Sequence, residues 1–193
     1  FSGPVTIDGG AGADTLTGSS GDDVLYGGDG DDVLTGSGGS DNIDGGGDSD
    51  KVIQSVDADQ TLTDNTLTGE GTDTLSAIES AALTGGAGDN AIDAGGFSGS
   101  VTIDGGAGAD TLTGGGGDDS IDGGSGTDQV VQSVDADQTL SDAQLTGAGT
   151  DVLINVESAQ LTGGAGDNTI DASGFAAGSV TIDGGAGADT LTG

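Results

Sequence analysis

The chain has 193 residues, of which 44 are glycine and 34 are acidic, and Lys51 is its only basic residue, so the formal net charge is −33. A nucleic-acid-binding surface needs clustered basic side chains, which excludes nucleic acid as a partner, and no apolar stretch is long enough for membrane insertion. Because histidine, cysteine and arginine are absent, most nucleophile–base pairs are excluded, and we expect no enzyme activity.

Two long repeats divide the chain. The segment VTIDGGAGADTLTG begins at residues 5, 101 and 180, and the segment QSVDADQTL begins at residues 54 and 132. The repeats define a first copy over 1–96, a second over 97–174 and the start of a third over 175–193. We expect one continuous solenoid over 1–193, because tandem repeats of this kind stack on their neighbours.

A nine-residue period lies inside these copies. Residues 9–53 divide into five nonapeptides of the pattern Gly-Gly-x-Gly-x-Asp-x-U-x, where U is aliphatic. In x-U-x the side chains alternate, so U points inward from a short strand, and the glycine-rich half reverses the chain. Two nonapeptides make one coil of 18 residues, which is also the difference in length between the first two copies.

The inward aliphatic residues can be followed along the whole chain at a spacing close to nine. They predict about ten coils, with wide coils over 54–84 and 132–162, and place every VTID strand on the same face. The predicted inward residues are Ile7, Leu16, Leu25, Leu34, Ile43, Val52, Leu62, Leu75, Leu83, Ile92, Ile103, Leu112, Ile121, Val130, Leu140, Leu153, Leu161, Ile170, Ile182 and Leu191.

The acidic residue at the sixth turn position predicts calcium sites along the edges of the solenoid. Calcium binds six to eight hard oxygen ligands, which carboxylates and exposed backbone carbonyl groups can supply. On one edge the strict alternation of strands predicts an unbroken column of Asp14, Asp32, Asp50, Asp73, Asn90, Asp110, Asp128, Asp151, Asn168 and Asp189. The turn glycines expected to offer carbonyl oxygens include Gly9, Gly12, Gly27, Gly30, Gly105 and Gly108.

Individual positions differ in their predicted strength as ligands. The pairs Asp14 with Asp32, Asp32 with Asp50 and Asp110 with Asp128 match the pattern best. Asn90 and Asn168 keep an oxygen but lose the charge, so weaker sites are expected there. The second edge matches only at Asp23 and Asp41, which form one pair, and at Asp119, for which no matching neighbour is expected.

Two further residue types recur in the predicted loops of the second edge. Glu79 and Glu157 occupy equivalent positions, and the favoured interpretation is a solvated or loop-capping acid rather than a calcium ligand. Phe1, Phe97 and Phe175 also recur there and are expected to pack over a loop, with contact to a neighbouring molecule as the alternative.

The tandem nonapeptides resemble the RTX (repeats-in-toxin) calcium-binding repeat family. The resemblance implies an all-β, right-handed parallel β-roll or β-helix solenoid with multiple Ca²⁺ ions in the turns. It also implies secretion, commonly by a type I route, and a chain that stays unfolded in the low-calcium cytosol and folds outside the cell.

The expected function is that of a structural segment in a large secreted surface protein, such as an extracellular filament, surface layer or adhesin stalk. Because the chain begins and ends in the same repeat, end-to-end self-association into a filament is a predicted partner interaction. The main alternative is an accessory module for export and folding of a secreted RTX enzyme or toxin. Ice binding and a serine–aspartate hydrolase are less favoured, because the outward strand residues vary and each aspartate cluster already has a calcium explanation.

Overall fold

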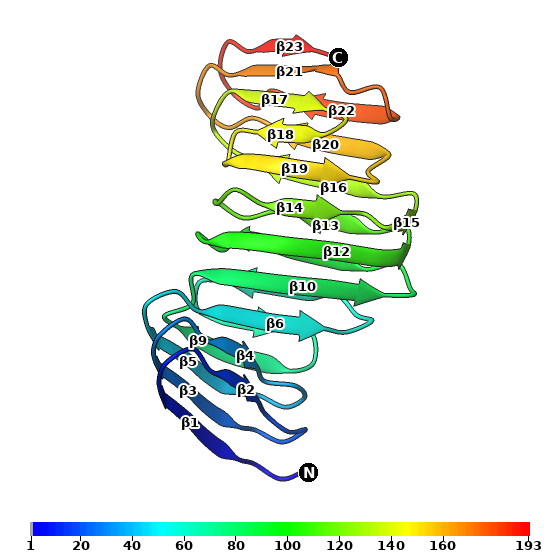
Figure 1. Ribbon diagram of the computed structural model, residues 1–193. Helices are drawn as coiled ribbons and strands as arrows, with labels where there is room; N and C mark the ends of the chain where they lie inside the picture. The colour runs from blue at the N-terminus through cyan, green and yellow to red at the C-terminus, as the bar shows by residue number, and fades with distance from the viewer. Residues whose placement is uncertain (1) are drawn as a thin grey trace.

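The computed structural model describes residues 2–193, and every element it contains there is a β-strand. Short strands alternate between two sheets that face each other, which makes an all-β solenoid with a mostly parallel strand pairing (Figure 1). Among these residues no helix has the length and apolar character needed to cross a membrane. The predicted fold class is confirmed. Phe1 lies outside the described residues.

Sheet 1 contains eleven strands. Their spatial order is β1 (Thr6–Ala11), β3 (Val24–Asp29), β5 (Asn42–Gly47), β9 (Thr72–Ser76), β8 (Thr66–Thr68), β7 (Gln60–Thr63), β11 (Ala91–Gly96), β13 (Thr111–Thr113), β16 (Gln129–Ser133), β20 (Ser158–Thr162) and β22 (Ser179–Asp183).

Sheet 2 contains twelve strands, one of which, β15 (Ser125–Gly126), pairs only with β12. The order of the others is β2 (Thr15–Thr17), β4 (Val33–Thr35), β6 (Lys51–Ser55), β10 (Ser80–Gly86), β12 (Ser100–Gly108), β14 (Ser120–Asp122), β19 (Thr150–Ile154), β18 (Gln144–Thr146), β17 (Gln138–Ser141), β21 (Thr169–Gly174) and β23 (Thr190–Thr192).

The core is a double column of the aliphatic residues that the nine-residue period selects. Leu25 and Ile43 are fully buried in sheet 1, and Leu34 and Val52 are fully buried in sheet 2. Parallel pairing keeps them in register, since Ile7 lies opposite Leu25 and Leu25 opposite Ile43. Among the predicted inward residues, Ile7 and Ile182 are only partly buried, and Leu191, in the outermost strand β23, is 47% exposed.

The wide coils fold differently from the prediction. Strands β7, β8 and β9 form a three-stranded antiparallel ribbon within sheet 1, which we call ribbon 1. Strands β17, β18 and β19 form the equivalent ribbon 2 within sheet 2. The middle strands bury Leu67 and Leu145, which were not among the predicted inward residues.

Each ribbon reverses the predicted alternation of sheets. Leu62 and Leu75 were expected on successive, opposite faces, but both lie in sheet 1 because the chain folds back between them. The VTID strands β1, β12 and β22 consequently lie in sheets 1, 2 and 1, so the prediction that they share one face is wrong. Equivalent strands of the first two copies lie on opposite sheets, for example β5 in sheet 1 and β14 in sheet 2.

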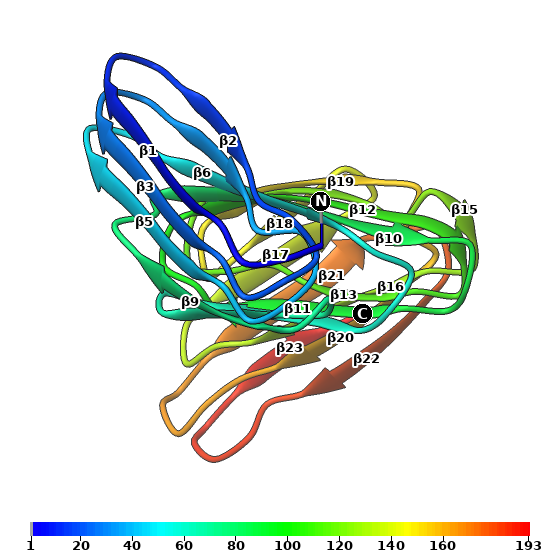
Figure 2. The same cartoon turned by 90° about the horizontal axis from the view of Figure 1, so that it is seen from below.

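The ribbons also make the solenoid uneven. Ribbon 1 places three strands between β5 and β11 in sheet 1, while β6 pairs directly with β10 in sheet 2. Ribbon 2 adds its strands to sheet 2 instead. The coils before ribbon 1 are tilted relative to the middle of the molecule in Figure 1, and Figure 2 shows the two ends turned in different directions. An excess of strands on one sheet accounts for such a bend, since neighbouring strands are about 4.8 Å apart.

Candidate calcium sites

Acidic side chains stack from coil to coil on both edges of the solenoid. We call edge 1 the side where the chain passes from sheet 1 to sheet 2, and edge 2 the opposite side. On edge 1 the Asp14 N–H donates to Asp32 Oδ1 at 2.7 Å, and the Asp32 N–H donates to Asp50 Oδ1 at 2.8 Å. On edge 2 the Asp110 N–H donates to Asp128 Oδ1 at 2.8 Å. The three best-matched pairs of the sequence analysis are therefore direct neighbours.

The predicted single column is divided between the two edges. Asp73 follows Asp41 on edge 2, because the Asp41 N–H donates to Asp73 Oδ1 at 2.9 Å. Edge 1 carries Asp14, Asp32, Asp50, Asp119, Asp151, Asn168 and Asp189, and edge 2 carries Asp23, Asp41, Asp73, Asn90, Asp110 and Asp128. The expectation of one unbroken column was wrong, since each ribbon moves the turns that follow it to the other edge.

Asp119 and the two phenylalanines are also placed differently from the prediction. Asp119 was expected to lack a matching neighbour, but its N–H donates to Asp151 Oδ1 at 3.1 Å. Phe97 follows β11 on edge 1 and is buried, whereas Phe175 follows β21 on edge 2 and is partly buried against the core. They therefore lie on opposite edges rather than on a common one.

The first glycine of each turn provides the space in which oxygen atoms converge. A Cβ atom on Gly9 would lie 2.7 Å from the Gly27 carbonyl oxygen and 2.8 Å from Asp14 Oδ2. A Cβ atom on Gly105 would lie 2.6 Å from Asp110 Oδ2 and 2.7 Å from the Gly123 carbonyl oxygen. The turn thus needs glycine because a carboxylate of the same turn and a carbonyl group of the next turn face that carbon atom.

The second residue of the turn divides the stacked turns into two classes. In open turns this residue has positive φ, as at Gly10 (94°) and Ser37 (70°), and its N–H does not bond the acid of the turn. In closed turns the N–H does bond that side chain, as from Gly115 to Asp119 Oδ2 at 2.7 Å. The acids of the buried open turns have an Oδ2 atom with no hydrogen-bond partner, and these are Asp14, Asp32, Asp41, Asp50, Asp110 and Asp128.

Three more of the predicted ligands, Asp23, Asn90 and Asn168, lie in closed turns. Ser19 donates to Asp23 Oδ2, and Gly86 and Gly164 donate to the side-chain oxygens of Asn90 and Asn168 at 2.9 and 3.0 Å. Together with Asp119, these side chains already accept a bond in the position where the open turns leave an oxygen free. A calcium ion at that oxygen would have to share it with this N–H group.

Burial makes the acids unfavourable as anions. Asp50 and Asp128 are fully buried, and Lys51 is the only basic side chain available in the chain. Burial, reinforced by neighbouring carboxylates, raises the pKa of Asp50 and Asp128, and it raises the pKa of Asp73 and Asp151 to about 6. A buried carboxylate without a cation is strongly destabilising, so the ionised form of these acids needs positive charge from outside the chain.

The available oxygen atoms fit calcium better than any metal that needs nitrogen or sulfur ligands. Among residues 2–193 no group of three acidic side chains is close enough to hold a metal ion, so backbone carbonyl groups must contribute. An unpartnered Oδ2 atom and a carbonyl oxygen of the next turn converge at five places. These pairs are Asp14 with Gly27, Asp32 with Gly45, Asp50 with Ala77, Asp110 with Gly123 and Asp128 with Asn155.

The structure explains why asparagine and not aspartate stands at positions 90 and 168, which the sequence analysis did not explain. Asp57 Oδ1 accepts bonds from the Gly88 N–H at 3.0 Å and from Asn90 Nδ2 at 3.4 Å. Backbone N–H groups, with Gly88 first, lower the pKa of Asp57, so its carboxylate is held ionised. Asp135 makes the same contacts with Gly166 and Asn168. The asparagine amide donates a hydrogen bond to this neighbouring carboxylate, whereas an aspartate would repel it. The QSVDADQ segment, which occurs identically in both copies, was the sequence feature that could have indicated this contact.

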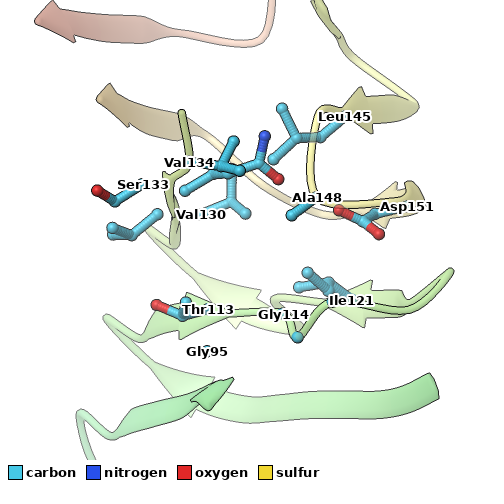
Figure 3. A pocket seen from close by; sticks show the side chains of 14 residues that line it. Gly95, Thr113, Gly114, Ile121, Val130, Ser133, Val134, Leu145, Ala148 and Asp151 are labelled. Atoms are coloured by element: carbon cyan, nitrogen blue, oxygen red, sulfur yellow. The ribbon is translucent and has the colours of Figure 1, made fainter. Parts of the chain in front are cut away.

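A cavity of about 170 Å³ lies between ribbon 2 and the turn before β14. Its lining includes Val130, Val134, Leu145 and Gly114, and Figure 3 shows the Asp151 carboxylate beside Ala148 at one side. Asp151 is the only ionisable residue among those that line it. The lining also includes Thr113, Gln132 and Ser133, so it combines apolar and polar surface around a single carboxylate.

Comparison with known protein families agrees with this geometry. The model of the RTX calcium-binding nonapeptide repeat matches residues 2–25, 17–52, 102–130, 160–175 and 176–193, which together cover more than half of the chain. No curated protein matches the chain. The matched residues contain all five convergent Oδ2 atoms, and the two ribbons lie between the matched segments. The chain belongs to the RTX calcium-binding nonapeptide repeat family.

Proposed function

We propose that this chain is a calcium-rigidified structural segment of a large secreted surface protein, such as an extracellular filament, surface layer or adhesin stalk. One observation carries the proposal: six buried carboxylate oxygens have no hydrogen-bond partner in a chain with a single basic residue. Calcium would supply the missing charge and ligate these oxygens together with backbone carbonyl groups. Its binding free energy then becomes folding free energy.

Calcium dependence supports a location outside the cell. The net charge of −33 and low aromatic content are typical of chains that stay expanded without a ligand. Such a chain remains unfolded at low calcium and becomes rigid at extracellular calcium concentrations. This behaviour and the family support secretion, for which a type I route is proposed.

A structural role accounts for the repeat organisation better than an accessory role. Every copy contributes strands to both sheets, and the ribbons add strands first to sheet 1 and then to sheet 2. This arrangement lengthens the solenoid rather than forming a binding cleft. The alternative, an export and folding module of a secreted RTX enzyme or toxin, predicts a catalytic domain elsewhere in the parent protein. Within this segment the cavity behind ribbon 2 has one ionisable residue, which supports a role other than catalysis.

Sedimentation velocity and far-UV circular dichroism in millimolar calcium and after chelation test the proposal. We expect an expanded chain without calcium and a rigid, elongated β structure with it. Higher oligomers at saturating calcium would support end-to-end self-association into a filament, and a monomeric rod would favour the stalk. Unchanged sedimentation and β structure after complete removal of calcium would refute calcium-gated folding.

A further inference from the structure

Two glutamates end the rows of stacked aspartates in a way that the nonapeptide pattern does not contain. Glu79 Oε2 accepts the Asp50 N–H at 2.9 Å, and Glu157 Oε2 accepts the Asp128 N–H at 2.9 Å. In the regular turns this N–H is bound by the aspartate of the next coil. Each glutamate therefore occupies the place of a column aspartate, although it lies in a loop, SAIES or INVES, without the glycine pattern.

The backbone fixes each glutamate against the preceding turn. The Asp50 carbonyl oxygen accepts bonds from the Glu79 and Ser80 N–H groups at 3.2 and 3.0 Å. The Asp128 carbonyl oxygen accepts the equivalent bonds from Glu157 and Ser158 at 3.1 and 2.9 Å. The same arrangement thus occurs twice, once on each edge, and does not depend on a flexible surface side chain alone.

An unpartnered buried oxygen points into each of these places. Asp50 and Asp128 are fully buried, and their Oδ2 atoms have no hydrogen-bond partner. A Cβ atom on Gly45 would contact both Asp50 Oδ2 and the Ala77 carbonyl oxygen, so these two oxygens face the same space. A Cβ atom on Gly123 would likewise contact Asp128 Oδ2 and the Asn155 carbonyl oxygen.

We propose that each row ends in a calcium site that a residue outside the nonapeptide motif completes, formed by Asp50, the Ala77 carbonyl and Glu79 in the first copy. The second site is formed by Asp128, the Asn155 carbonyl and Glu157. Each site combines two carboxylates with a carbonyl oxygen, and the exposed side of the loop admits water to complete the coordination shell. The inference rests on the proposed calcium-dependent function and extends it to residues that the family match leaves out, since the matched segments end at residues 52 and 130.

These sites would allow the solenoid to leave the nonapeptide pattern without exposing an unpaired charge. Each ribbon ends directly before the loop that carries the glutamate, since β9 ends at Ser76 and β19 ends at Ile154. A terminal ion neutralises the last aspartate of the row at the point where no further nonapeptide turn stacks on it. The sequence analysis favoured a solvated or loop-capping acid at Glu79 and Glu157, and the proposal adds a ligand role to the capping contacts that both side chains make.

Calcium stoichiometry measured by native mass spectrometry, alongside calorimetric titration of the whole chain, tests the sites. Glu79→Gln and Glu157→Gln keep an oxygen for the Asp50 and Asp128 N–H groups but remove the charge. Each variant is expected to bind one calcium ion fewer than the unmodified chain at the same free calcium, and the double variant two fewer. Glu70→Gln, which removes the same charge from an exposed position on ribbon 1, should bind the full number.

The outcomes separate this inference from the proposed function. Unchanged stoichiometry and affinity in the double variant would overturn the role of Glu79 and Glu157 as calcium ligands while leaving calcium-gated folding intact. Absence of calcium binding by the unmodified chain would overturn both. As a measurement that needs no variant, crystals grown in calcium should show an ion about 2.3–2.6 Å from the Asp50 and Glu79 carboxylates, and an ordered loop without an ion there would contradict the site.

Discussion

At the scale of single residues, the orientation of one peptide decides whether a turn aspartate is free to bind a cation. In open turns the second residue adopts positive φ, which glycine tolerates at little cost, and the aspartate keeps an oxygen without a partner. Ser37 adopts the same conformation with φ 70°, so the open turn before Asp41 is maintained without glycine at that position. The turn conformation, and not the presence of the acid alone, therefore determines which aspartates keep an oxygen without a hydrogen-bond partner.

Asp32→Asn tests the ligand role in the middle of a row. The substituted side chain keeps an oxygen for the Asp14 N–H but loses the charge at a fully stacked open turn. We expect the calcium concentration at half-folding, followed by circular dichroism, to rise about tenfold, which corresponds to about 1.4 kcal/mol. Asp31→Asn is the matched control, because Asp31 is exposed in the same turn and bonds Ser49 through one oxygen. Equal effects of the two substitutions would contradict the ligand assignment.

The raised pKa values of Asp73 and Asp151 predict an opposite effect of acid on the calcium-free and calcium-bound chains. Both titrate at about 6 when folded, against 3.8 for an unperturbed aspartate, because burial disfavours the charged form. Above pH 6 the ionised groups destabilise the calcium-free fold, and this destabilisation is removed as the pH falls from about 6 towards 3.8. In calcium, acid instead competes with the ion for the carboxylates.

Circular dichroism between pH 5 and pH 7.5, in buffers stripped of divalent ions, measures this effect. We expect β structure in the calcium-free chain to increase as the pH falls through 6. The Asp73→Asn, Asp151→Asn double variant should show a weaker pH dependence and more β structure at pH 7.5. If the double variant had the same pH profile as the unmodified chain, the two buried aspartates would not be the cause, and the effect would come from the general loss of net charge.

At the scale of elements, each ribbon is held by a buried amide pair instead of an ion. Gln54 Nε2 donates to Gln60 Oε1 at 3.1 Å and to the Thr68 carbonyl at 2.9 Å, while Gln60 Nε2 donates to the Thr84 carbonyl at 2.9 Å. Gln132 and Gln138 repeat these bonds in ribbon 2. Both ribbons are thus joined to the neighbouring strands by contacts that need no calcium.

Gln60→Leu separates this contribution from metal binding. The substitution removes two side-chain hydrogen bonds, the one to the Thr84 carbonyl, which keeps the Val56 N–H, and the one that Gln60 accepts from Gln54, so the folded state should be destabilised by about 1–3 kcal/mol. The calcium concentration at half-folding should rise, whereas the number of ions bound at saturation, counted by native mass spectrometry, should stay the same. A reduced ion count would show that the amide pair supports a calcium site rather than the ribbon alone.

The sequence predicted which residues face inward better than it predicted which sheet they join. The period of nine identifies Leu62 and Leu75 as core residues, and both are buried. It does not distinguish a strand that crosses to the other sheet from one that folds back antiparallel, because both alternate inward and outward side chains. Because the reversal of the chain at Leu67 was not recognised, the turns after it were predicted on the wrong edge. Neighbouring pairs such as Asp110 with Asp128 were therefore predicted correctly, but the whole column was not.

At the scale of the whole molecule, the net charge could be neutralised either by general screening or by ions at fixed sites. Screening acts on exposed charges, and a Debye length of about 8 Å at physiological ionic strength already weakens their repulsion. The six unpartnered Oδ2 atoms are buried, and five of them lie beside carbonyl oxygens, where mobile ions do not replace coordination. The fold should therefore respond to the identity of the cation and not only to ionic strength.

Small-angle X-ray scattering can distinguish the two explanations. An unfolded chain of this length has a radius of gyration of about 47 Å, and calcium should reduce it to that of an elongated, bent rod. Magnesium at the same concentration should fail, because it requires near-octahedral geometry at about 2.0–2.1 Å and retains its water, whereas calcium accepts larger and less regular sets of carboxylate and carbonyl oxygens. Sodium chloride that matches the ionic strength should also fail. Compaction by magnesium or sodium equal to that by calcium would mean that screening alone folds the chain and that the buried oxygens need no bound ion.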